Sequence, residues 1–197
     1  MGRLALAEPT TPAYTPSATT VAILPVQNSA PMRHPDKDSP EHGKQALEGQ
    51  TALTQLFAAH GFKIADQAAV TTAVHVSGID MAAPSSWNAA TFAKLGRATH
   101  ADLIVFFVIT DTHQGFRHGL LAPSQREGEA KTKLWLIDVR SGAPTIDGAT
   151  AAGKARQGML QGFGLRGGNS PFVLKAIDDA AEQSLSNFLT QYPLASK

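Results

Sequence analysis

The sequence predicts an α/β (α+β) fold, a mixed, largely antiparallel sheet of about five strands packed by three main helices. Residues 103–109 are consecutive apolar residues, Leu-Ile-Val-Phe-Phe-Val-Ile, which is typical of a strand buried on both faces. Residues 134–142 read as a second strand that ends in a Ser-Gly turn, so we expect it to lie beside the first. The surrounding order of strands and helices favours a sheet covered by helices.

The other elements follow in chain order. Strands are predicted at 20–26, at 62–65 and, as a weaker edge strand of small residues, at 144–155. Helices are predicted from about Pro40 to His60, at 68–75, after a cap at Ser85 or Ser86, and after Asn169-Ser170-Pro171. Their apolar faces are expected at Leu47, Leu53, Leu56 and Phe57, then at Trp87, Ala90, Leu95 and Ala98, and last at Val173, Ile177, Ala180, Leu185, Phe188 and Leu189. Polar loops are expected at 27–40 and 112–130, and a glycine-rich loop at 156–168.

Composition bounds the classes of function. The 197 residues suit one globular domain at 20–192, with a short tail at 193–197. Lys and Arg number 17 against 16 Asp and Glu, so the charge excess typical of nucleic-acid-binding proteins is missing. The chain has no cysteine, which excludes disulfides, thiol catalysis and zinc–thiolate sites. No apolar run approaches the ~18 residues of a transmembrane helix.

Residues 1–19 are predicted to be a disordered tether. Residues 8–19 are rich in Pro and Thr, a composition that is not expected to pack in a core and that favours an extended chain. Leu4-Ala5-Leu6-Ala7 has the small residues that signal peptidase prefers, so it is either the remnant of a signal peptide or an ordinary Ala/Leu stretch.

Several phrases together resemble one family of bacterial envelope proteins. They are the strand at 21–26, the Gly61-Phe62-Lys63-Ile64 phrase, Leu95-Gly96 followed by Ala101-Asp102 and the apolar run, the 136–142 hairpin and the closing amphipathic helix. This order is similar to the family that includes CsgG, the amino-terminal domain of TolB, and LpoB. A glycine that the family has after its middle strand is not evident at Ile109-Thr110. The resemblance implies a non-enzymatic extracytoplasmic adaptor or assembly domain, periplasmic or associated with the outer membrane, that works through contacts with envelope proteins or with itself.

The glycine-rich loop is the best candidate for a partner contact. Its apolar residues lack a core period and lie beside an arginine; the predicted partner-binding residues are Met159, Leu160, Phe163, Leu165 and Arg166. The alternative is that these side chains fold over the sheet as part of the core. Arg166, Gly167, Gly168 and Asn169 could also bind an anion, because backbone amides converge at a helix start.

Two glycine patterns in this part of the chain are weak matches to nucleotide-binding motifs. Residues 148–154 have P-loop spacing but continue with Ala155 instead of a hydroxyl residue, inside a predicted strand. Residues 162–167 fit G-x-G-x-x-G but precede the last helix, with no strand following. We therefore expect no nucleotide cofactor.

The alternative function is that of a metal-binding protein or metal-dependent enzyme. Asp111, His113 and His118 could supply three ligands to a divalent ion, with Glu127 or Glu129 nearby. Solvated loop histidines are the simpler interpretation, so no cofactor is predicted. Asp138 is expected to bond the backbone of its own turn rather than to act as a base.

Overall fold

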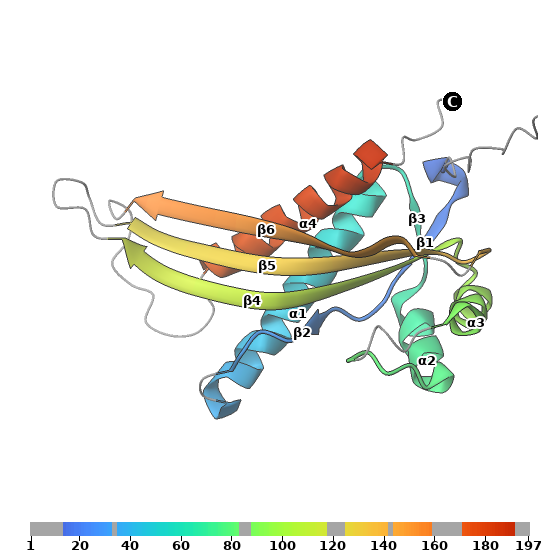
Figure 1. Cartoon of the computed structure of the whole chain (residues 1–197), viewed down its shortest axis with the longest axis horizontal. Coiled ribbons are helices and arrows are strands. Elements are labelled where there is room, and N and C mark those ends of the chain that lie inside the picture. Colours follow the sequence, from blue (N-terminus) through green and yellow to red (C-terminus); the bar gives the residue numbers. More distant parts are fainter. Residues whose placement is uncertain are drawn as a thin grey trace, which may run out of the picture.

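A computed structural model describes residues 14–32, 35–82, 88–117, 125–141, 144–158 and 171–191 (Figure 1). These residues form four α-helices and a mixed, mostly antiparallel sheet of six strands, so the predicted α+β class is confirmed. The sheet follows the order β3 (Lys63–Ile64), β1 (Thr20–Ile23), β4 (Leu103–Arg117), β5 (Gln125–Asp138) and β6 (Pro144–Gly158), and β2 (Gln27–Asn28) also pairs with β4. The β1–β3, β1–β4 and β2–β4 pairs are parallel, whereas β4–β5 and β5–β6 are antiparallel.

The three antiparallel strands are much longer than the sequence predicts. Pairing of β4 with β5 runs from Leu103 opposite Asp138 to Arg117 opposite Gln125, and β6 pairs with β5 as far as Gly158. The expected polar loop at 112–130 is therefore wrong over most of its length, and the expected loop at 156–168 begins too early. A polar sequence can extend a strand when only one face is buried and small residues occupy that face, which the apolar run alone does not reveal.

The first predicted strand, 20–26, is interrupted in the structure. β1 ends at Ile23 and the chain resumes as β2 at Gln27, beside the same strand β4. Ile23 and Gln27 are four residues apart, whereas their partners in β4, Val105 and Val108, are three residues apart. Pro25 lies in this break, where its missing N–H costs no ladder hydrogen bond.

The first long helix, α1 (Pro35–Ala59), begins five residues before the predicted start at Pro40. The predicted loop at 27–40 is thus wrong, since it contains β2 and the first turns of α1. Pro40 lies within the helix but near its amino-terminal end. Its missing N–H there removes only one of the first hydrogen bonds of the helix. Leu53 and Phe57 are fully buried as predicted, but Leu47 is 67% exposed.

Two shorter helices follow, and side chains cap both of them. In α2 (Gln67–Ser77) the Asp66 carboxylate accepts a hydrogen bond from the Ala69 amide at 2.8 Å. In α3 (Ala89–Thr99) the cap is Asn88, whose Oδ1 accepts from the Thr91 amide at 3.0 Å, rather than a serine at 85 or 86. Residues 85–87 lie outside the described residues. The buried face of α3 consists of Phe92, Leu95, Gly96 and Thr99, so the prediction is right for Leu95 and wrong for Ala90 and Ala98.

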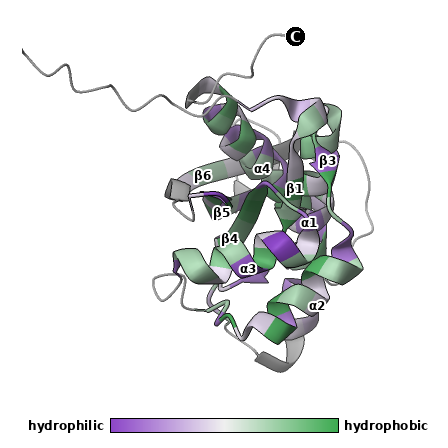
Figure 2. Ribbon diagram, turned by 90° about the vertical axis from the view of Figure 1, so that its right-hand side faces the viewer, coloured by the Kyte–Doolittle hydropathy of each residue, from purple (hydrophilic) through white to green (hydrophobic). Residues whose placement is uncertain are grey.

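The last helix, α4 (Pro171–Gln191), buries the predicted stripe except for Leu189, which is half-buried. Helices α1 and α4 pack on one face of the sheet in a cluster that includes Leu53, Phe107, Ile177 and Phe188. A second cluster on the other face joins α2 and α3 to the strands through Val70, Phe92 and Phe106, among others. Figure 2 shows α4 and α3 on opposite sides of the strands.

Tyr14 extends the domain before residue 20. Its ring is 3% exposed, packs 6.1 Å from the ring of Phe188, and its hydroxyl donates to Asp138 Oδ2 at 3.2 Å. Asp138 Oδ1 accepts from the Ser141 amide at 2.9 Å, which confirms its predicted role in the turn. The expectation that residues 8–19 take no part in a core is therefore wrong for Tyr14, while the division of the chain into tether, domain and tail stays a prediction.

Candidate functional site

In the halves of β4, β5 and β6 that lie farthest from α2 and α3, one face of the sheet is covered by no described helix. Figure 1 shows α1 and α4 behind this part of the strands, and α2 and α3 at the other end of the sheet. Ala130 and Thr132 are buried toward α4, and side chains alternate along a strand, so Glu129 and Lys131 point the other way. We call this surface the open face; its residues are Asp111, His113, Gly115, Glu127, Glu129, Lys131, Lys133, Ala152 and Lys154.

Charges on the open face pair across the strands. Lys131 Nζ lies 3.0 Å from Asp111 Oδ2, and Lys154 Nζ lies 2.6 Å from Glu129 Oε1. The hydrogen bond from Lys154 holds the pKa of the Glu129 carboxyl below its ordinary value. His113 lies directly opposite Glu129 in the register. These groups are largely exposed, so they define the chemistry of the surface and add little to stability.

Small residues hold the opposite face of these strands tightly against α4. A Cβ at Gly153 would collide with the carbonyl oxygen of Ala176, and one at Gly128 would collide with the backbone of Phe172. Ala130, Ala151 and Ala155 are buried on the same side. The open face is thus backed by a helix at close contact, which makes it a rigid platform.

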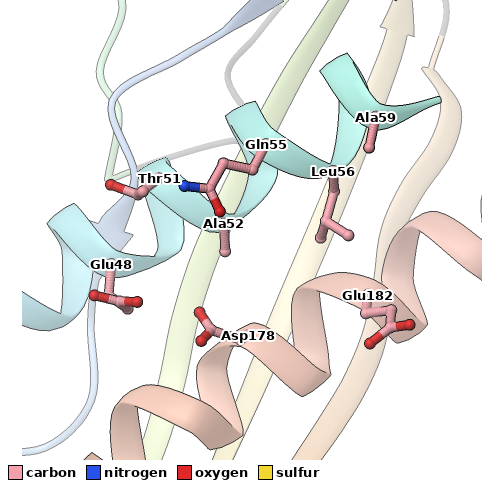
Figure 3. Close-up of a pocket in the computed structure, with 8 residues that line it drawn as sticks. All are labelled: Glu48, Thr51, Ala52, Gln55, Leu56, Ala59, Asp178 and Glu182. Atoms are coloured by element: carbon pink, nitrogen blue, oxygen red, sulfur yellow. The ribbon is translucent and has the colours of Figure 1, made fainter. Parts of the chain in front are cut away.

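A pocket of about 330 Å³ lies on the outer side of the molecule, between α1 and α4. We call it the α1–α4 groove; in Figure 3 the two helices flank it and its lining side chains are labelled. Ala52 is buried and Leu56 half-buried, whereas Thr51, Gln55, Ala59 and Glu182 are exposed. The lining residues are Glu48, Thr51, Ala52, Gln55, Leu56, Ala59, Asp178 and Glu182.

Asp178 is the most perturbed acid among the described residues of the groove. Burial, and after it the negative charge of Glu48 across the groove, raise the pKa of its carboxyl to about 6, and Asp179 acts in the same direction. Lys175 acts in the opposite direction and does not prevent the rise. The buried oxygen Oδ1 of Asp178 has no hydrogen-bond partner within the described part of the chain.

The predicted partner loop lies outside the described residues. This applies to Met159, Leu160, Phe163, Leu165 and Arg166, and to the anion candidates Arg166, Gly167, Gly168 and Asn169. β6 ends at Gly158, opposite Gln125, and α4 begins at Pro171, so the loop joins the open-face strands to the helix behind them. The predicted roles of these residues stay predictions.

The predicted metal set is only partly described. Asp111 and His113 lie two residues apart on the open face, where Asp111 pairs with Lys131, and His118 is outside the described residues. Within the ranges that the structure describes, no three His, Cys, Asp or Glu side chains are grouped closely enough to hold a metal ion. Residues 148–154 lie inside β6, as the sequence predicts, and so do not form a P-loop.

The α1–α4 groove was missed in the sequence. Its acids flank two apolar stripes: Glu48 lies one turn before the buried Ala52, and Asp178 lies one turn before the buried Ala181. Acids at the edges of two amphipathic helices are a signal in the sequence, but only the tertiary packing shows that they face each other.

Comparisons with known proteins show the fold and not the family. The sequence matches no protein-family model and has no significant match among curated proteins. Solved structures with a similar fold include the hypothetical protein CT253 from Chlamydia trachomatis, with a TM-score of 0.51 and 14% identity over 88% of this chain and 96% of that one. The lipoprotein GNA1162 from Neisseria meningitidis has a TM-score of 0.47 and 16% identity over 86% and 99% of the two chains.

LpoB from E. coli is also among the similar structures, with a TM-score of 0.37 and 12% identity over 71% of this chain and 57% of LpoB. At these identities the likeness is one of fold alone. The resemblance to CsgG and to the amino-terminal domain of TolB stays a prediction. No helix in the described ranges is both long and apolar enough to cross a membrane.

Proposed function

We propose that this chain is a non-enzymatic, extracytoplasmic domain of the bacterial cell envelope that acts as an adaptor by docking protein partners. The observation that carries the proposal is the open face, a three-stranded surface that is rigidly backed by α4. Its lysines and carboxylates pair along the sheet instead of converging on a cavity. Such a surface suits contact with another protein more than it suits chemistry on a small substrate.

The loop after β6 would supply the apolar part of the contact. It starts at the end of the open face and carries Phe163 and Leu165, and large apolar side chains dominate the binding energy of protein interfaces. A polar platform beside an apolar loop would resemble an interface rim beside its core.

Crosslinking in envelope fractions of the native organism tests this proposal. The full chain is compared with a variant lacking residues 159–168, which spares the paired residues 156–158, and with the double variant Lys131→Glu, Lys154→Glu. The control is Lys63→Glu, which makes the same type of charge change at an exposed residue of β3, the strand at the opposite edge of the sheet. We expect one defined set of envelope proteins to be captured by the wild type and the control, and lost by the other two variants.

Equal capture by all four proteins would overturn the proposal. A second measurement separates contact from folding: Phe163→Ser with Leu165→Ser should weaken capture and leave the melting temperature unchanged. A collapse of the melting temperature would place these side chains in the core and remove the loop from the interface.

A further inference from the structure

The α1–α4 groove has an apolar floor and acidic ends. Ala52 and Leu56 form the floor, Glu48 and Asp178 face each other at one end, and Glu182 lies toward the other end (Figure 3). Among the described residues that line the groove, none is basic. The nearby Lys175 directs its ammonium group to Asp179, at 3.2 Å. The groove therefore concentrates negative charge over an apolar surface.

We propose that the α1–α4 groove is the docking site for a basic segment of a protein partner, which places a lysine or arginine side chain between apolar side chains. The charge of the groove is complementary to such a segment. A long basic side chain also matches the lining in a second way, because its methylene stem can cover Ala52 and Leu56 while its charged end reaches the carboxylates.

The shape of the groove favours a chain segment over a small molecule. The lining residues of α1 run from Glu48 to Ala59, which at 1.5 Å per residue is a length of about 16 Å. The groove is open along this length, because Thr51, Gln55, Ala59 and Glu182 are exposed. A helical or extended peptide can lie along such a surface, as in helix-in-groove recognition.

The surroundings of Asp178 also favour a cationic side chain in the groove. Burial first, and then Glu48 from α1 and Asp179 from α4, oppose the ionisation of the Asp178 carboxyl, and Lys175 alone among the groups that act on it favours the charged form. A docked cation would lower the pKa of this carboxyl and release any bound proton. Binding should accordingly be tighter at pH 7.5 than at pH 5.

The groove is separate from the open face, since α1 and α4 pack on the other side of the sheet. The proposal therefore stands or falls independently of the proposed function.

Synthetic peptides test the proposal on the full chain. Three peptides of about 15 residues share the same leucines and carry Lys, Gln or Glu at the remaining positions. We expect the Lys peptide alone to bind and to shift the backbone amide NMR signals of Thr51, Ala52, Gln55 and Ala59. The double variant Glu48→Gln, Glu182→Gln should weaken this binding by about tenfold or more.

Glu129→Gln is the control, because it removes one charge from the open face, on the other side of the sheet, and leaves the groove and the groups that act on Asp178 unchanged. Its affinity for the Lys peptide should stay within about twofold of the wild type. Thr51→Arg is a second, independent variant on the exposed rim. It places a cation in the groove and should block binding although every acid of the groove is kept.

Three results would overturn the proposal: no peptide binds at millimolar concentration, the three peptides bind equally, or the shifted amides lie elsewhere. Spermidine serves as the small-molecule arm. If it binds the same amides as tightly as the Lys peptide, the groove is a polyamine site and the protein partner is excluded.

Discussion

At the scale of single residues, Gly128 and Gly153 determine how closely α4 approaches the sheet. A Cβ on Gly153 would meet the carbonyl of Ala176, and backbone atoms cannot rotate away as a side chain can. We expect Gly153→Ala to lower the free energy of unfolding by about 2 kcal/mol, as in other overpacked cores, because α4 must shift outward. Urea denaturation measures this change.

Gly43→Ala is the control for Gly153→Ala. Gly43 lies in α1, and a Cβ there would meet no atom within 4 Å. Because alanine is the better helix former, we expect this variant to gain about 0.5–1 kcal/mol. If Gly153→Ala also gains stability, α4 does not lie as close to β6 as the structure places it.

The raised pKa of Asp178 should make the stability of the fold depend on pH. That pKa is about 6 in the folded chain against 3.8 for an ordinary aspartate, so the folded state binds the extra proton between these values. This group therefore lowers stability progressively as pH rises from about 4 to 6, and it stays unfavourable above 6.

Asp178→Asn removes this ionisation. We expect the variant to be more stable than the wild type at pH 7.5 by about 1 kcal/mol, a figure reduced for the partial exposure of the group, and to differ little at pH 4. Thermal melts across this range measure the difference. A stability difference that does not change with pH would mean that the carboxyl is not perturbed by its surroundings.

At the scale of elements, α3 shows how a helix boundary can be tested. The Asn88 side chain accepts hydrogen bonds from both the amide and the hydroxyl of Thr91. We expect Asn88→Ala to cost about 1 kcal/mol in urea denaturation, since the first turn loses its cap. Asn187→Ala, on the exposed side of α4, should be neutral or slightly stabilising. Equal effects of the two variants would refute the cap at Asn88.

The elements also show what sequence patterns can and cannot predict. The buried half of β4 was predicted because a strand buried on both faces is a continuous apolar run. The stripe of α4 was predicted because a helix buried on one face has apolar residues at helical spacing. The polar half of β4 and β5 was missed because its inner face uses Gly128 and Ala130, which carry little hydrophobic signal. The early start of α1 was missed because Pro40 normally marks a helix start.

The candidate sites were less predictable than the elements. Open-face pairs such as Asp111 with Lys131 depend on a register that joins residues far apart in the sequence. The α1–α4 groove depends on how two parallel-running helices pack, and no local pattern encodes that packing. The predicted loop 156–168 is wrong for residues 156–158, which belong to β6, and the predicted partner contact of the residues after them stays a prediction.

At the scale of the whole molecule, one residue ties the amino-terminal segment to the closing elements of the fold. Tyr14 contacts Phe188 of α4 and hydrogen-bonds Asp138 at the end of β5. It thus links three segments that are distant in the chain, on the face of the sheet that carries the larger core. The packed part of the chain accordingly includes Tyr14.

Truncation tests where the domain begins. We expect deletion of residues 1–13 to leave the melting temperature within about 1 °C of the full chain, because a Pro/Thr-rich tether is predicted there, and deletion of residues 1–19 to lower it strongly, because it also removes Tyr14. Tyr14→Ala should cost about 3 kcal/mol, as for other buried aromatic residues, and Tyr14→Phe only about 1 kcal/mol, since it loses one hydrogen bond but keeps the ring. Differential scanning calorimetry of the four variants measures these steps. If the two deletions melt at the same temperature, Tyr14 is not part of the cooperative unit and the domain begins at β1.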